Sequence, residues 1–322
     1  MAAATYILAD YDDPDLPAMT AVPGSVHFPL SLPHDAYSIL ATKTGWSISC
    51  GQDRLTDSDL KDCSVVVYRR WRSSPPAPLV RADAEADASA RAFIERQWNS
   101  TIAGLLSLAY DSEPAKWSRD PIAVDNKIRN LWQIRDLVPT LETVIGTSTP
   151  VIGTPAVLQQ VIWKPVDVDQ SVAGGRATTV VAPPPHAESR EPCPAFYQRR
   201  INSVAEIRVG YSFGTVSSVW QEPINAPESA IDLRYVDMDR KPYPHPLIEQ
   251  QARDIARALR KEMYTADILV DTAGQMWWTD INPDGLFSGA DSPEGALSTC
   301  LTTGIRLQAS LPPTHRGNRD AS

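Results

Sequence analysis

One stretch of the chain decides the fold: residues 266–285 read ADILVDTAGQMWWTDINPDG. Two largely apolar runs flank the small residues Ala273-Gly274, and this pattern predicts a β-hairpin. We expect its strands over Asp267–Val270 and Gln275–Ile281. Residues with oxygen-bearing side chains begin the first strand and end the second. We therefore expect a functional site at the end of the hairpin that lies opposite its turn.

The oxygen-bearing side chains belong to Asp267, Asp280 and Asn282. Because side chains alternate along a strand, Asp280 and Asn282 should point to one face and Ile281 to the other. Mg²⁺ favours one or two carboxylates together with phosphate oxygens and water, so this set suits Mg²⁺ bound with ATP better than a closed protein cage. The alternative is a solvated strand face, because alternation alone indicates only a half-buried strand.

The composition sets the class of protein. With 322 residues and 43% hydrophobic content, the chain can bury a sizeable core in one large or two to three small domains. It contains no apolar run of about 18 residues, and its start is acidic rather than basic, so we expect a cytoplasmic protein without a membrane span. A net charge of −9 disfavours partners such as nucleic acid or an anionic membrane. The four cysteines are widely spaced and are expected to be reduced and structural.

The rest of the chain mixes helical and strand patterns. Helices are predicted over 83–109, 126–137 and 247–262. Strands are predicted over 5–9, 63–68, 143–145, 161–163, 195–198, 206–211 and 216–221. Turns and prolines fill the segment between the first two strands. Glycines and prolines without periodicity indicate a loop over 167–192, and the tail beyond Leu311 is expected to be disordered.

The hairpin resembles the last metal-binding segment of ATP-grasp ligases, where an acidic residue, any residue and asparagine follow the turn. Other segments resemble, in order, landmarks of the peptide-modifying branch, the microviridin-type (graspetide) ligases: Val66–Arg72, Cys193-Pro194, Gln198, Glu206–Val209 and Asp232–Arg234. The resemblance covers about residues 65–290. It implies an α+β (α/β) ATP-grasp fold whose lobes clamp ATP. The implied parts are an amino-terminal α/β domain over 1–110, a central lobe over 111–200, a carboxy-terminal lobe over 201–310 and a tail over 311–322.

The resemblance also implies roles for single residues. The metal ligands would be Asp267, Asp280 and Asn282. Catalytic roles at the phosphoryl group and the acceptor fall to Arg208, Arg234 and Lys164, with Asp232 beside Arg234. Nucleotide contacts fall to Lys127, Lys164, Gly174, Gly175, Gln198, Arg199, Arg200, Ile201 and Glu206. A guanidinium suits bidentate bonding to phosphoryl oxygens, and lysine supplies a compact charge. Each residue type also has an ordinary explanation: a lone lysine is more often a surface residue, Arg208 and Glu206 could form a surface ion-pair ladder, and the glycines could belong to a solvent loop.

The function that the resemblance implies is an ATP- and Mg²⁺-dependent ligase for a ribosomally made precursor peptide, leader plus core. It would activate Asp or Glu side chains as acyl phosphates and join them to Ser or Thr as esters, or to Lys as amides, forming macrocycles. The cluster Arg69–Arg72 is expected at an edge or cleft that serves the peptide, and a homodimer is a further expectation. Two alternatives stay open: a ligase that adds a free amino acid or amine to a small carboxylate or peptide terminus, and a degenerate module that binds peptide without turnover.

Two positions depart from the family pattern. Arg199 stands where the segment between the lobes usually has glutamate, and Asp280 replaces a longer glutamate. The first change should alter nucleotide contacts. The second shortens the side chain by one methylene but keeps a carboxylate, so metal binding is still expected.

Overall fold

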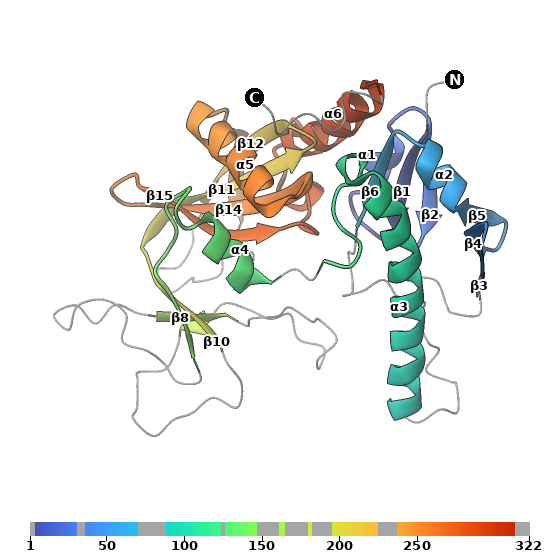
Figure 1. Ribbon diagram of the computed structural model, residues 1–322. Helices are drawn as coiled ribbons and strands as arrows, with labels where there is room; N and C mark the ends of the chain where they lie inside the picture. The colour runs from blue at the N-terminus through green and yellow to red at the C-terminus, as the bar shows by residue number, and fades with distance from the viewer. Residues whose placement is uncertain are drawn as a thin grey trace.

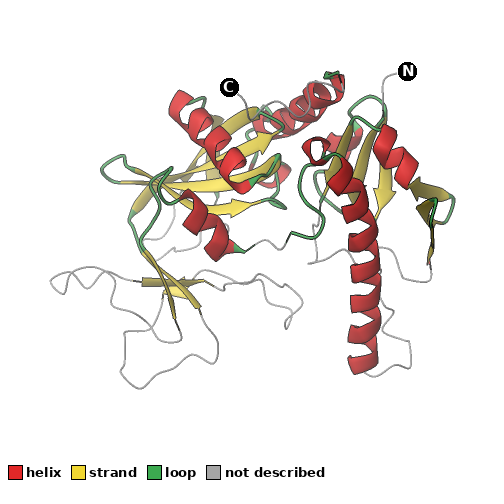
Figure 2. Ribbon diagram, viewed as in Figure 1, coloured by secondary structure: helices red, strands yellow, loops and turns green. Residues whose placement is uncertain are grey.

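The structure is a computed structural model that describes residues 4–30, 36–69, 88–123, 126–146, 161–164, 180–181, 195–224 and 237–312. These residues form four β-sheets with helices packed against them (Figures 1 and 2). The fold class is α+β, as the sequence predicts. No helix in the described part of the chain combines the length and hydrophobicity that a membrane span requires.

The amino-terminal unit is built on a parallel sheet of order β2-β1-β6. Its strands are β1 (Thr5–Ala9), β2 (Ser25–Pro29) and β6 (Val65–Tyr68). Both faces are apolar, as is usual for a parallel sheet that is covered on both sides. The side chains on one face, Leu8, Val66 and Tyr68 among them, pack into a core with α3 (Ala88–Ser112). Those on the other face, which include Ile7 and Val67, pack against the carboxy-terminal lobe.

A small antiparallel sheet of order β3-β4-β5 flanks the parallel sheet. The elements of this region are α1 (Leu16–Thr20), β3 (Tyr37–Thr42), β4 (Gly45–Cys50), β5 (Asp53–Thr56) and α2 (Asp57–Asp62). A capping box between Thr56 and Asp59 begins α2. The expectation of turns and prolines between the first two strands is therefore wrong. These elements have only four to six residues each, too few for a helical or strand period to stand out.

The central lobe contains a sheet of order β7-β10-β8-β9. Its strands are β7 (Thr143–Gly146), β8 (Val161–Lys164), β9 (Val180–Val181) and β10 (Ala195–Arg199). The predicted strands agree, but β9 lies inside the segment predicted as a loop, whose other residues are outside the described ones. The helix before this sheet, α4 (Lys127–Ile134), is shorter than the predicted 126–137, and the Asn126 side chain caps it by accepting from the Arg129 N–H.

The carboxy-terminal lobe is a five-stranded antiparallel sheet of order β13-β12-β11-β14-β15. Its strands are β11 (Ser203–Ser212), β12 (Thr215–Pro223), β13 (Met238–Pro242), β14 (Met263–Asp271) and β15 (Met276–Asn282). The turn between β11 and β12 places Phe213 and Gly214 at φ 43° and 85°, the conformation that tight hairpins require. The hairpin of β14 and β15 is longer than predicted, so Asp267 lies inside its strand rather than at the start.

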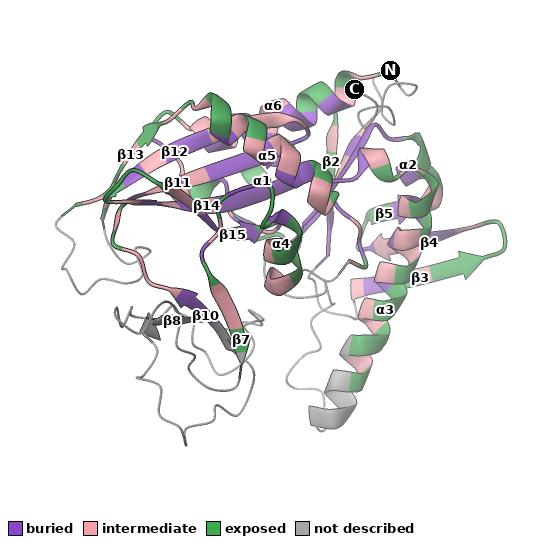
Figure 3. Cartoon of the chain, turned by 60° about the vertical axis from the view of Figure 1, so that its left-hand side comes forward, coloured by how far each residue is buried: buried purple, intermediate pink, exposed green. Residues whose placement is uncertain are grey.

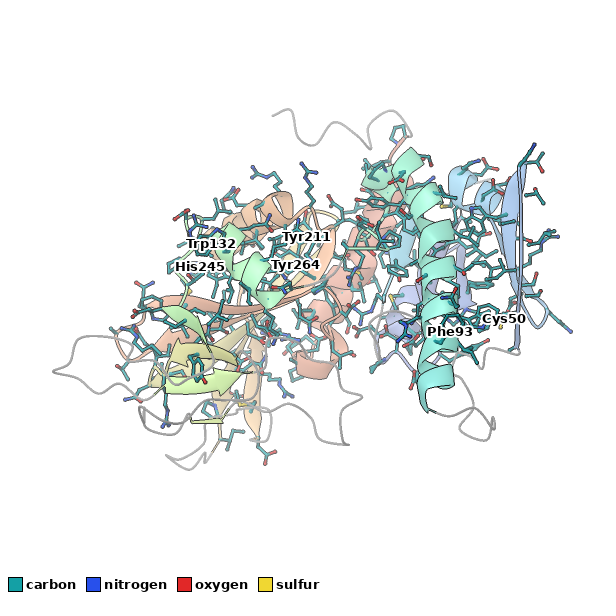
Figure 4. The ribbon with its side chains drawn as sticks, turned by 60° about the horizontal axis from the view of Figure 1, so that its bottom comes forward. Cys50, Phe93, Trp132, Tyr211, His245 and Tyr264 are labelled. Atoms are coloured by element: carbon teal, nitrogen blue, oxygen red, sulfur yellow. The ribbon has the colours of Figure 1, made fainter. Side chains whose placement is uncertain are left out.

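Helices cover both faces of this sheet. On one face α4 and α5 (Pro246–Leu259) bury an apolar layer in which Tyr211 and Tyr264 stack with ring centroids 5.2 Å apart (Figure 4). On the other face α6 (Ala296–Ser310) packs between the sheet and the amino-terminal unit (Figure 3). The sequence did not predict α6, because its serines, threonines and Gly304 are poor helix formers.

Three of the cysteines, Cys50, Cys63 and Cys300, are buried free thiols, as expected. Cys193 lies outside the described residues, as does the tail from 313 onward. The predicted domain boundaries stay predictions, although the four sheets fall within the three predicted parts of the chain.

Candidate functional site

The face of the five-stranded sheet opposite α4 and α5 is apolar where α6 packs on it and carries polar side chains farther along β11. Along β11, Ala205, Ile207 and Val209 are fully buried against α4 and α5, whereas Glu206 and Arg208 point the other way and are partly exposed. The pattern of β11 thus places a carboxylate and a guanidinium on the face opposite those two helices, as the sequence predicts.

Neighbouring strands extend this polar face into a row. Arg208 pairs with Asp267 across β11 and β14, and Asp267 pairs with Asp280 across β14 and β15. The register shifts between Asp267 and Ile268, and the Thr279 hydroxyl donates to the Asp267 carbonyl at 3.2 Å. Such a bulge lets an edge strand change the direction of its side chains. The two carboxylates therefore lie side by side at the same level of the sheet.

Cations neutralise this pair of carboxylates. The Arg208 guanidinium donates to Asp267, and Lys127 Nζ, from the first turn of α4, lies 3.4 Å from Asp280 Oδ2. Burial lowers the pKa of Arg208, but Asp267, Glu206 and Asp280 outweigh it and raise this pKa above the ordinary arginine value. The guanidinium is therefore charged at any pH at which the protein is folded. Lys127 thus lies beside Asp280, and the nucleotide contact that the resemblance implies for it stays a prediction.

Asn282 lies one step further along β15 than the two carboxylates. It pairs with Thr265, and Ile281 between it and Asp280 is buried in the opposite core, so the predicted alternation is confirmed. The Asn282 side chain is exposed, and its Oδ1 accepts from the Asp284 N–H at 3.0 Å. Among the described residues no cluster of three or more His, Cys, Asp or Glu gathers. Two carboxylates and an amide form the donor set of an open cation site, which leaves positions for phosphate and water.

The end of β10 and the residues that link it to β11 carry several of the predicted nucleotide contacts. Gln198 is fully buried on β10, donates to Thr143 Oγ1 at 3.1 Å, and has no hydrogen-bond partner for its Oε1 within the described ranges. Arg199 lies over the Trp277 ring at 5.4 Å, and the Trp277 indole N–H donates to Asp271 at 2.9 Å. Arg200 and Ile201 follow, between β10 and β11. An unpaired buried amide oxygen is what a site for a hydrogen-bond donor would contain.

Several predicted site residues cannot be placed. Lys164 ends β8, where its backbone pairs with Phe196, but its side chain is outside the description. Gly174, Gly175, Asp232 and Arg234 lie outside the described residues altogether. Their assigned roles therefore stay predictions.

One expectation is wrong. Arg69 does not serve an edge or cleft, because it is completely buried and its guanidinium contacts Asp13, Asp15 and the Gly285 carbonyl. Burial lowers its pKa, but Asp13 and Asp15 outweigh that effect and raise it. The other members of the arginine cluster are outside the described residues.

A group of charged residues around the hairpin of β14 and β15 has no counterpart in the sequence predictions: Asp13, Asp15, Arg119 and Asp284. They come from three distant segments, so no local pattern links them. Only the acidic run near the amino terminus, YDDPD over residues 11–15, was a signal.

Known structures share this architecture. The macrocyclase MdnC from Microcystis aeruginosa MRC, bound with precursor peptide MdnA, matches with a TM-score of 0.68 at 17% identity, over 93% of this chain and 98% of that one. The ATP-grasp ligase PsnB, complexed with a precursor variant, Mg and ADP, matches with 0.70 at 16% identity, over 96% and 99%. The ATP-grasp ligase from Chryseobacterium gregarium, in complex with ADP and a leader and core peptide, matches with 0.63 at 14% identity, over 93% and 95%. No family model and no curated protein matches the sequence. The chain has the ATP-grasp fold of these peptide-modifying ligases.

Proposed function

We propose that this chain is an ATP-dependent carboxylate ligase that acts on a ribosomally made precursor peptide. It activates Asp or Glu side chains as acyl phosphates and joins them to Ser, Thr or Lys side chains, closing macrocycles. The observation that carries the proposal is the row Arg208, Asp267 and Asp280, with Lys127 and Asn282 beside it, on the polar part of one face of an ATP-grasp sheet. Two structures of the same fold support the choice of substrate: one is a macrocyclase bound with its precursor peptide, and the other is an ATP-grasp ligase in complex with a leader and core peptide.

ATP and Mg²⁺ are the proposed cofactors, and the residues present fit them. Asp267, Asp280 and Asn282 would hold the cation, which would supply charge neutralisation for the phosphates. In the structure both carboxylates have a cationic partner, Arg208 or Lys127. Arg208 and Lys127 would then lie beside the phosphates, where their charged groups can bind phosphate oxygens. The two carboxylates and the two cationic side chains therefore balance one another in charge before the ligands bind.

On the nucleotide side, we assign adenine recognition to the segment from Gln198 to Ile201. The unpaired Oε1 of buried Gln198 supports this assignment, because adenine offers a donor amine. Glu206 lies on the same face as Arg208, two residues closer to this segment, and suits a sugar hydroxyl as acceptor. Gly174 and Gly175 keep the role of a phosphate loop that the resemblance gives them.

In the first chemical step an oxygen of the substrate carboxylate attacks the γ-phosphorus, and ADP leaves. Arg208 stabilises the charge on the phosphoryl group in transfer, and Lys164 is assigned the same role. In the second step the hydroxyl or amine of the acceptor attacks the acyl carbon, and phosphate leaves with the activated oxygen. Arg234 is assigned to the acceptor side. The net change in the peptide is the loss of one water for each ring.

The proposal is tested with the purified full chain, ATP, Mg²⁺ and, as candidate precursor, any short acidic or Thr-rich peptide that a search of the flanking DNA finds encoded beside the gene. Mass spectrometry should show loss of one water per ring, with one phosphate released for each loss. Hydroxylamine, added as a trap, should convert the acyl phosphate to a hydroxamate at Asp or Glu. Asp280→Ala should abolish both products and serves as the matched negative control.

Each alternative predicts a different result. A ligase that adds a free amino acid or amine gives a gain of mass on the substrate instead of a loss. A module that only binds peptide gives no phosphate release stimulated by peptide. The proposed mechanism is wrong if Asp280→Ala leaves that release unchanged. The expected homodimer is checked separately by light scattering of the purified chain.

A further inference from the structure

The loop that follows β15, residues 283–288, is held by charged residues from outside the sheet. Arg119, in the segment between α3 and α4, forms an ion pair with Asp284 in which Nη1 lies 2.6 Å from Oδ2. The Arg119 side chain is only 3% exposed, and its Nη2 donates to the Ala123 carbonyl at 3.4 Å. Arg119 is therefore fixed at both ends of its guanidinium while it binds the loop.

The next residue of the loop is held from the amino-terminal unit. Arg69 Nη1 donates to the Gly285 carbonyl at 3.2 Å. Its other nitrogens lie 2.7 Å from Asp13 and 3.1 Å from Asp15, and all three side chains are 0% exposed. A planar guanidinium that is held at several points keeps its direction, so the Gly285 carbonyl has a fixed partner.

Asp15 completes the set. Its two carboxylate oxygens accept from the N–H groups of Phe287 and Ser288 at 2.9 and 2.8 Å. The loop is thus held at Asp284, at Gly285 and again at Phe287 and Ser288. The residues that hold it come from before β2, from the end of β6 and from the segment after α3.

This loop determines the direction of the Asn282 side chain. Asn282 Oδ1 accepts from the Asp284 N–H, and the Asn282 carbonyl accepts from the Gly285 N–H at 3.1 Å. The position of the Asp284 N–H therefore fixes the position of the Asn282 amide oxygen. An Asp284 carboxylate fixed by Arg119 fixes that backbone in turn.

Packing alone does not account for these charges. Burying an ion pair costs desolvation energy, and apolar residues of similar volume often stabilise an interface better. The neighbouring interface between the amino-terminal sheet and α6 is in fact apolar. What a buried arginine adds is direction, because its donors fix the position of the groups that accept from them.

We propose that Arg119 is a positioning residue of the metal site: through Asp284 it orients Asn282 for cation binding. Arg69 and Asp15 fix the base of the same loop. The inference rests on the proposed function, since it assumes that Asn282 binds the cation of a metal nucleotide. Partners that orient metal ligands change metal affinity by about 10–100-fold when they are removed.

The test measures metal binding rather than turnover. Mn²⁺ binding to the full chain in the presence of ADP is followed by electron paramagnetic resonance, with no peptide added. Arg119→Met should weaken Mn²⁺ binding about 10–100-fold, while the affinity for ADP without metal stays at the wild-type value. Arg119→Lys should restore part of the affinity, because it returns the charge that faces Asp284. Arg257→Met, which removes an exposed ion pair with Asp254 on α5, is the matched control and should change neither affinity.

The outcomes separate the two proposals. Wild-type affinity for Mn²⁺ in Arg119→Met, even with a lower melting temperature, would show that Arg119 serves stability alone and overturn the inference. Should that variant fold poorly, Asp284→Asn makes the same test, because it removes the ion pair without changing the size of the side chain. A wild-type chain that binds ADP with no effect of Mn²⁺ contradicts the proposed function itself.

Discussion

Arg208 and Asp267 face each other across β11 and β14, and the guanidinium of the first donates to the carboxylate of the second. Arg208 is the proposed phosphoryl-binding group and Asp267 a proposed metal ligand. Substitution of Arg208 alone therefore tests the phosphoryl role while the metal ligand stays in place.

Arg208→Met should lower the rate of peptide-dependent phosphate release by a factor on the order of 100, because one charged donor to the transferred group is lost. Arg208→Lys should recover little of it, since an ammonium cannot reproduce the fork of donors. The Mg²⁺ concentration for half-maximal rate should stay near the wild-type value, because Asp267 remains. Steady-state assays with varied Mg²⁺ check this, with Arg253→Met on α5 as the exposed control. A changed Mg²⁺ requirement with an unchanged maximal rate would reverse the assignment.

Arg69→Met should destabilise the protein by about 3–5 kcal/mol, because it leaves Asp13 and Asp15 buried without their cation. Unfolding in guanidinium chloride, followed by far-UV circular dichroism, measures the change. The control is Lys61→Met, which removes an ion pair whose lysine is 57% exposed and should cost less than about 1 kcal/mol. An equal loss in the free energy of unfolding for both substitutions would contradict a larger contribution of the buried cluster to stability.

Gly285→Ala should reduce both stability and activity. A Cβ at this position would meet Thr265 Oγ1 at 1.8 Å, so either the loop or β14 must move. Overpacking of this kind costs about 1–3 kcal/mol. Gly104→Ala is the matched control in α3, where a Cβ meets nothing within 4 Å, and it should stabilise the helix by up to about 1 kcal/mol. Thermal unfolding should show a lower melting temperature for Gly285→Ala and a higher one for Gly104→Ala than for the wild type.

Cys300 should not react with a thiol reagent near neutral pH while the protein is folded. Burial raises the pKa of its thiol to about 12, so the reactive thiolate is scarce up to that pH. Burial raises the pKa of the Cys50 thiol in the same way. Alkylation followed by peptide mass mapping should therefore label neither residue in the native protein and both in denaturant. Labelling of native Cys300 at the rate of an exposed thiol would contradict the burial.

The hairpin of β14 and β15 could be predicted from the sequence because its information is local. Alternation of side chains places Asp280 and Asn282 on one face, and Ala273-Gly274 gives the turn. The pairing of Arg208 with Asp267 follows from strand register, which the sequence alone does not state, although it did place both residues on strands.

The contacts that hold the hairpin could not be predicted. Arg69 and Gly285 are 216 residues apart, and Arg119 and Asp284 are 165 apart, so no window of sequence relates them. The burial of Arg69 could not be predicted either, because an arginine at the end of an apolar strand is usually solvated. Asp13 and Asp15 neutralise it inside the protein, but their own sequence has the composition of an ordinary polar loop.

The parallel sheet of the amino-terminal unit has consequences for the modularity of the protein. Ile7 and Val67 on one of its faces share a core with Phe287 and Leu297 of the carboxy-terminal lobe, so the two parts have one interior between them. A gene fragment that lacks the first strands would leave α6 with an uncovered apolar side. An exchange of the amino-terminal unit between relatives therefore requires an exchange of α6 with it. In such a chimaera the contacts of Arg69 and Asp15 with the loop 283–288 would join residues from two parents.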